Sequence, residues 1–290
     1  MADLYKKNLL KISALHDLGE GAVRSFIKRH FMTFDEGNVV DSKSIISEFA
    51  DYGFDRVLKS FAEGKMDFKS LKSVETGAVL EETVLDNCLR VAKGYDSDCL
   101  DVIIKAGKYT SQELATSFIL LCKKHKELIE KGLLQTACMD LKTVFDSFLA
   151  HQMDLNAHAE NTMPFHALCD LYNTAKTSKY ANNVPESYGK MLATCLDIAL
   201  NNGADLNAVD GEYKTAFSFN NMEMKSKFVR FQKMKEDKRL LDLFMIMNQV
   251  LTGGVTDESK ALVKKHIADL QQDVSNYAKR ARFINEMEDR

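Results

Sequence analysis

The sequence predicts an almost wholly helical protein. Only two prolines, Pro164 and Pro185, occur in 290 residues, so few positions would break a helix. Leu, Ala, Lys and Glu, which favour helices, are plentiful, whereas alternating runs of β-branched residues are scarce. With 45% hydrophobic and 28% charged residues, the chain has the composition of a globular protein with a sizeable core. We therefore expect an all-α fold.

Several functional classes find no support in the composition. The net charge of −3 gives no general argument for binding nucleic acid or an anionic membrane. The six cysteines show no Cys-x-x-Cys spacing, so we interpret them as reduced core thiols of a cytoplasmic protein. No secretory signal, membrane span, phosphate-binding loop or His-Glu-x-x-His motif is recognised. We predict no metal, no cofactor and no catalytic residue.

The first region, residues 1–95, has the apolar spacing of successive short helices. Expected helices cover about 3–16, 23–31, 45–49, 54–62 and 80–92. The polar residues at 41–44 offer N-caps for the third of them. No motif that carries catalysis lies in this helical region.

Residues 96–222 contain an internal repeat. Three segments follow one template with Asp in third position: CLDVIIKAG ending at Gly107, VFDSFLAHQ ending at Gln152 and CLDIALNNG ending at Gly203. A fainter copy, RVLKSFAEG, ends at Gly64. Recurring helical segments of this kind predict a stack of similar units.

The clearest unit spans residues 195–219. A helix ending at Asn202-Gly203 is followed by a turn-rich strip and by a new segment opening at Thr215. Gly203 suits the left-handed backbone that closes a helix. The preceding unit has the same order, with DLNA at 154–157 and a Pro-Phe-His opening at 164–166, although Gln152 stands where Gly is usual.

These residues resemble the ankyrin repeat, in which a Gly-Ala-Asp-Val-Asn-Ala finger joins two helices and Thr-Pro-Leu-His opens the next one. The later unit matches it at Gly203, Ala204, Asp205, Leu206, Asn207, Ala208, Asp210 and Thr215, whereas Ala216, Phe217 and Ser218 replace Pro, Leu and His. The resemblance is specific over residues 143–220 and implies an ankyrin-like helical solenoid over 96–222. The units are longer than the family period of about 33 residues, and the polar stretch 173–189 is expected to be a surface insertion.

The resemblance also implies a binding surface rather than a catalytic one. Ankyrin-like proteins bind a partner protein with their finger tips and the adjoining concave helix face. The finger tips expected to project are His158, Glu160 and Asn161 in one unit, and Asp210, Glu212 and Tyr213 in the next. An exposed Tyr is of the type that anchors interfaces, although Tyr213 can equally pack on the neighbouring finger. Lengthened units with polar insertions resemble effector or inhibitor proteins of intracellular bacteria or phages, which implies delivery to a host cytosol.

Residues 223–290 are predicted to form long helices. One helix or a helix pair covers about 225–251 and stops at the Thr-Gly-Gly of 252–254, and Asp257 caps a final helix. The apolar residues of that final helix alternate spacings of four and three: Val263, Ile267, Leu270, Val274, Tyr277, Ala281 and Ile284. This seam either caps the end of the solenoid or joins two copies into a homodimer.

An enzyme with an unrecognised site remains an alternative. His166, Cys169 and Asp170 share one helix face, with His151 and His158 in the neighbouring loop, so a thiol nucleophile or a zinc site can be drawn from them. The structural interpretation is better, because His166 occupies the position of the structural His in the family.

Nucleic-acid binding through the basic helix 225–239 is another alternative. Its cations are Lys225, Lys227, Arg230, Lys233, Lys235, Lys238 and Arg239. Phe228 and Phe231 lie among them, and aromatic residues among lysines normally indicate one buried and one solvated helix face.

Overall fold

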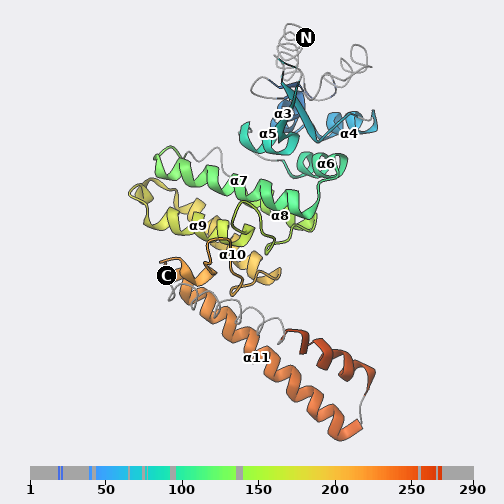
Figure 1. Ribbon diagram of the computed structural model, residues 1–290, viewed down its shortest axis with the longest axis vertical. Coiled ribbons are helices and arrows are strands. Elements are labelled where there is room, and N and C mark those ends of the chain that lie inside the picture. The colour runs from blue at the N-terminus through green and yellow to red at the C-terminus, as the bar shows by residue number, and fades with distance from the viewer. Residues whose placement is uncertain are drawn as a thin grey trace, which may run out of the picture.

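The protein is mostly helical, as predicted (Figure 1). The computed structural model describes residues 39–40, 44–64, 66–73, 76, 78–91, 96–134, 140–253, 256–265 and 267–269, together with Gly19 and Gly21. The helices expected over 3–16 and 23–31 lie outside the described residues, and so does the seam from Leu270 onward.

The described helices follow one another along the chain with connections of different lengths. They are α3 (Ile45–Asp51), α4 (Asp55–Glu63), α5 (Val84–Val91), α6 (Ser97–Gly107), α7 (Ser111–Glu130), α8 (Leu141–Ala150), α9 (Pro164–Thr177), α10 (Glu186–Asn201) and α11 (Met222–Gly253). Two short 3₁₀ helices, η2 (Ala181–Asn183) and η3 (Ala216–Ser218), lie between them, and residues 257–265 are also helical.

A small sheet corrects the all-α prediction. Strands β1 (Val39–Val40), β2 (Ser70–Ser73) and β3 (Val79–Thr83) form it in the order β1-β2-β3, with β1 parallel and β3 antiparallel to β2. The helix expected from residue 80 begins only at α5, because Thr83 ends the strand and starts the helix. Its hydroxyl accepts from the Asp86 amide at 3.1 Å and donates to the Asp86 carboxylate at 2.8 Å.

Several predicted helix ends are confirmed. Thr110 and Glu113 form the expected capping box at the start of α7, and the Ser44 side chain caps α3. Pro164 occupies the first turn of α9. Gly203 follows α10 with a φ of +91°, and Gln152 follows α8 with a φ of +63°. Gln152 therefore takes the left-handed backbone that favours glycine, in the position where the repeat pattern has Gly.

Two other expectations need correction. The segment 173–189, expected to be a surface insertion, is partly helical, because α9 continues to Thr177 and α10 already begins at Glu186, with η2 and short loops between them. The helix expected at Thr215 is a single 3₁₀ turn, η3, which Thr215 and Ser218 cap reciprocally. The next long helix starts at Met222.

The helices from α5 to α10 form two rows. In one row α7 packs between α5 and α9, and in the other α8 packs between α6 and α10. The rows are joined by aromatic packing, for example between Phe118 of α7 and Phe145 of α8, whose ring centroids are 5.2 Å apart. One hydrophobic cluster runs from Ile45 in α3 to Phe228 in α11, so the described core is continuous.

Successive loops are hydrogen-bonded to one another at the same edge of this stack. The Asp154 amide donates to the Ser111 hydroxyl at 2.9 Å, which joins the start of α7 to the next loop. Asn156 then joins that loop to the following one, donating to the Gly203 carbonyl at 3.0 Å and accepting from the Asp205 amide at 2.9 Å. These bonds satisfy backbone groups that a loop would otherwise leave to water, and they hold the loops in line.

Helix α11 is one continuous helix that begins against the stack and extends away from it (Figure 1). Phe228 is fully buried, with its ring centroid 5.8 Å from those of Phe165 and Phe217. Lys227 pairs with Asp197 of α10 at 2.7 Å. The first turns of α11 therefore cover the end of the stack, while the rest of the helix projects beyond it.

Candidate functional site

The first finger ends in a tight two-residue turn. Ala159 and Thr162 exchange two backbone hydrogen bonds of 2.9 Å, and the residues between them, Glu160 and Asn161, have φ values of +52° and +61°. Positive φ at both central positions is the geometry of a type I′ turn. His158, Glu160 and Asn161 are all exposed, so this finger presents the three side chains expected at its tip.

The second finger is built around a residue that we expected to project. Asp210 is only 7% exposed, which corrects that expectation. One of its carboxylate oxygens accepts from the Glu212 and Lys214 amides, each at 2.9 Å, and therefore fixes the turn from inside. Glu212 and Tyr213 are exposed as predicted, and Tyr213 is 55% exposed in a left-handed conformation with a φ of +61°.

The two fingers contact each other through their backbones. The Gly211 amide donates to the Asn161 carbonyl at 3.0 Å. A Cβ atom at Gly211 would lie 2.9 Å from that same carbonyl oxygen and 3.1 Å from the Asn161 Cα, so only glycine allows this approach. The exposed side chains of both fingers are therefore carried on one connected strip.

Beside this strip lies a hollow that we call the finger groove. Helices α7 and α9 and both fingers line it, and its volume is about 250 Å³. Ion pairs cross it: Lys123 of α7 pairs with Glu160 at 3.2 Å, and Lys126 of α7 pairs with Asp170 of α9 at 2.6 Å. Opposite charges alternate here, so the finger groove has no strong preference for a single sign of charge.

His166 and Cys169 of α9 are both buried. Cys169 is fully buried, and burial raises the pKa of its thiol well above the usual value, which favours the neutral thiol over the thiolate. The Nδ1 atom of His166 lies 3.3 Å from an Asp210 oxygen, which links α9 to the next finger. Burial lowers the pKa of His166, although the Asp210 carboxylate opposes this effect. The structural interpretation of His166 requires a contact between units, and in this structure that contact is with the Asp210 carboxylate.

A larger hollow lies on the other side of Glu160, between α5, β3 and α7. We call it the acidic groove, and its volume is about 610 Å³. The apolar residues that line it are Leu89, Tyr109, Leu120 and Leu121. The carboxylates that line it are Glu81, Glu82, Asp86, Glu113 and Glu160. Sequence reasoning missed this groove, because no local pattern shows that Leu120 of α7 is left 40% exposed.

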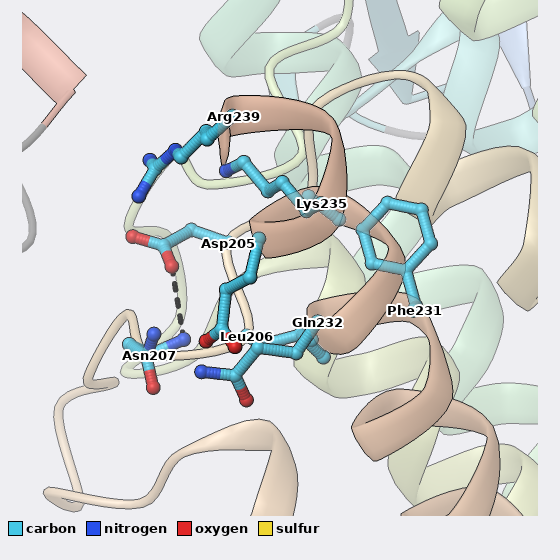
Figure 2. Close-up of a pocket in the computed structure, with 9 residues that line it drawn as sticks. Asp205, Leu206, Asn207, Phe231, Gln232, Lys235 and Arg239 are labelled. Atoms are coloured by element: carbon cyan, nitrogen blue, oxygen red, sulfur yellow. Dashed lines mark hydrogen bonds between the residues drawn. The ribbon is translucent and has the colours of Figure 1, made fainter. Parts of the chain in front are cut away.

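A third, small hollow separates the second finger from α11 (Figure 2). Lys235 and Arg239 of the basic helix extend over the turn that carries Asp205, whose carboxylate accepts from the Asn207 amide at 2.9 Å (Figure 2). The volume is about 70 Å³, which suits water rather than a side chain. Phe228 is buried, and Phe231 is half-buried and lines this hollow beside Lys235 and Arg239. The aromatic and basic side chains are therefore not separated onto opposite faces of the helix, which corrects that expectation.

Other kinds of site were sought in the same residues. Within the described ranges, no three His, Cys, Asp or Glu side chains are placed to hold a metal ion. His151 instead lies 2.7 Å from Asp101 of α6. None of the helices described combines the length and apolar character that a membrane span requires. Comparisons of the chain with protein-family models, with curated proteins and with solved structures found no match.

Proposed function

We propose that this chain is an ankyrin-like solenoid that binds a partner protein with its finger tips and the adjoining concave helix face. The architecture supports this reading because two rows of helices stack while their connecting loops are hydrogen-bonded at one edge. A protein of this kind acts by occupying its partner, as an effector or inhibitor does, and needs no catalytic residue. A host cytosol is the compartment in which we expect it to act.

The observation that carries the proposal is the continuity of the two grooves. Glu160 at the tip of the first finger lines both of them, so the two grooves lie next to each other along α7, between β3 and the second finger. Hollows of this size, lined by both apolar and charged side chains, accept protruding side chains of a partner. The ion pairs at Lys123 and Lys126 are partly exposed, so a partner can exchange them for its own charges at low cost.

The second finger supplies the first test. Replacing Glu212 and Tyr213 with Ala removes an exposed charge and an exposed aromatic ring without touching Asp210, which holds the turn. We expect a partner captured from candidate host lysate by the wild-type chain to be retained at least tenfold less by the double variant, because an aromatic anchor contributes a large share of binding free energy. Quantitative mass spectrometry of the captured proteins is the measurement.

The matched control replaces Glu186 and Lys190 with Ala. These side chains form an exposed ion pair at the start of α10, and they are 83% and 75% exposed. The control should capture the same partner as the wild-type chain. Equal capture by the Glu212→Ala/Tyr213→Ala variant would contradict a role for the second finger.

A second candidate function, self-association, is favoured by the projecting part of α11. Leu240, Leu241 and Met245 are 65%, 58% and 54% exposed, and Val263 and Ile267 of the predicted seam are 38% and 49% exposed. The two segments run close to each other, since Arg239 lies 3.9 Å from Asp269. Pairing of two such hairpins from two copies would bury these apolar side chains.

Light scattering coupled to size exclusion tests self-association. We expect a particle of twice the 32.7 kDa chain mass, which Leu240→Lys with Met245→Lys should convert to a monomer. Leu133→Lys is the control, because Leu133 is a 59% exposed leucine in the loop after α7. A wild-type chain that elutes as a monomer at high concentration would overturn this candidate.

A further inference from the structure

We propose that the acidic groove takes a cationic, apolar peptide segment: one or two large apolar side chains flanked by Lys or Arg. This inference rests on the proposed function, because it names the chemistry of the partner at the concave face. The groove lies between α5, the end of β3 and the middle of α7, and it opens beside the first finger at Glu160.

The floor of the groove is apolar and partly uncovered. Leu89 and Leu121 are 3% exposed and form the sides of the two helices that meet there, whereas Leu120 is 40% exposed. A leucine left in contact with water at the bottom of a hollow gains free energy when an apolar side chain covers it, about 25 cal/mol for each Å² of apolar surface removed from water. The floor therefore selects for an apolar anchor.

The rim is strongly acidic. Five carboxylates line the groove against two cations, Arg90 and Lys124. Arg90 is engaged by Glu82 at 2.6 Å. Lys124 donates to the carbonyls of Leu89 and Arg90 near the end of α5, at 2.9 and 2.7 Å. The lining consequently carries an excess of three negative charges.

Two of these carboxylates pair with no cation among the described residues. Asp86 accepts from the hydroxyls of Ser117 and Thr83, at 2.5 and 2.8 Å. Glu81 is exposed at the mouth of the groove. Glu113 and Glu160 form ion pairs with Lys69 and Lys123, which are 39% and 47% exposed. A partner that brings its own Lys or Arg to this rim gains charge-assisted hydrogen bonds without displacing a buried ion pair.

The finger groove differs from the acidic groove both in its charges and in its floor. There, acidic and basic side chains alternate and pair with each other, and no leucine lies exposed on its floor. The acidic groove is thus the part of the concave face with a defined chemical preference. Apolar anchors in a desolvated pocket carry most of the binding free energy in an interface, and surrounding charges set specificity and the rate of association.

Selection of peptides tests the proposal. A library of short random linear peptides displayed on phage would be panned against the full chain, and the enriched sequences would be compared with the naive library. We expect enrichment of Leu, Ile, Phe or Met flanked by Lys or Arg. Enrichment of acidic peptides, enrichment without charge preference, or no enrichment would each overturn the assignment of this groove.

Binding of synthetic, fluorescein-labelled copies of the enriched peptides would then be measured by fluorescence anisotropy. Leu120→Lys and Glu81→Lys should each weaken binding at least tenfold. The first replaces the exposed apolar side chain of the floor with a positive charge, and the second introduces a positive charge that repels the Lys or Arg of the peptide. The controls are Leu133→Lys and Glu130→Lys, which make the same changes at exposed positions outside the groove. Thermal unfolding of all four variants would verify that they are folded.

The two proposals fail in different ways. If the peptides still bind the Leu120→Lys and Glu81→Lys variants but not the Glu212→Ala/Tyr213→Ala variant, the fingers bind and the acidic groove does not. If binding is lost in the groove variants and kept in the finger variant, the acidic groove is the docking site. If the controls weaken binding as much as the groove variants, the effect is one of net charge and the inference is wrong.

Discussion

Gly107→Ala is expected to destabilise the protein by about 3 kcal/mol. Gly107 ends α6, and a Cβ atom there would lie 2.4 Å from Cε2 of Tyr109 and 2.8 Å from the Phe68 carbonyl oxygen. Both distances are far below van der Waals contact, so the ring or the backbone must move.

The Tyr109 ring has little freedom to move. Its hydroxyl donates to the Phe68 carbonyl at 3.1 Å and accepts from the Leu85 amide at 3.0 Å. The ring therefore joins the loop after α6 to the residues just before β2 and to the start of α5. Displacing the ring therefore breaks two buried hydrogen bonds, and each is worth about 1 kcal/mol. Overpacking adds about 1 to 3 kcal/mol.

Denaturant unfolding of Gly107→Ala measures this effect. The control is Gly64→Ala, because Gly64 ends α4 with a φ of −74° and a Cβ atom there would meet nothing closer than 3.4 Å. We expect that control to change the free energy of unfolding by less than about 1 kcal/mol. In a Tyr109→Ala background, Gly107→Ala should cost less than it does alone, because the ring is absent. Equal costs in the two backgrounds would show that the clash with Tyr109 is not the cause.

Acidification from about pH 7 to pH 5 is expected to lower the free energy of unfolding by about 2 kcal/mol through His125 alone. His125 of α7 is fully buried, with Nδ1 2.9 Å from the hydroxyl of Tyr188 in α10. Burial, assisted by the charge of Lys124, lowers the pKa of His125 to about 3. The imidazole in the unfolded chain has a pKa of about 6.5. Between these two values the unfolded state takes up a proton that the folded state excludes, so stability falls as the pH falls.

His125→Gln tests the assignment, because Gln keeps a polar side chain and does not titrate. Its free energy of unfolding should change by about 2 kcal/mol less than that of the wild-type chain between the same two pH values. The control is His158→Gln, because His158 is exposed on the first finger. Carboxylates with a lowered pKa, such as Glu113 and Asp101, lose their contribution below about pH 5, so they change little between these two pH values. If the free energy of unfolding of His125→Gln fell between the two pH values as much as that of the wild-type chain, His125 would titrate normally in the folded protein.

Much of the helical framework was predictable because the signals that specify it are local. The capping box at Thr110, the Pro-Phe-His opening at Pro164 and the left-handed Gly203 each act within about one helical turn, so their residues identify a helix end without tertiary information. The sheet was missed for the complementary reason. Residues 79–83 become a strand because β2 offers a partner, and two strands of four and five residues are too short to show a clear alternation in the sequence.

The site was predictable only in part. The tips of the first finger followed from the repeat pattern, and His158, Glu160 and Asn161 are exposed there. Asp210 occupies a position that looks like a tip in the sequence, but its carboxylate is turned inward to the amides of its own loop and to His166. Asp readily accepts hydrogen bonds from the backbone two residues on, and this tendency was the available signal.

The sequence by itself determined that the chain is mostly helical, where most described helices begin and end, and which loops repeat. Those features depend on periodicity and capping, which the residues carry locally. Only the tertiary structure decided that Leu120 stays uncovered, that five carboxylates surround it and that Lys124 is used to cap α5. Whether a side chain faces a neighbour or a hollow depends on how distant helices stack, and no local pattern in the chain encodes that arrangement.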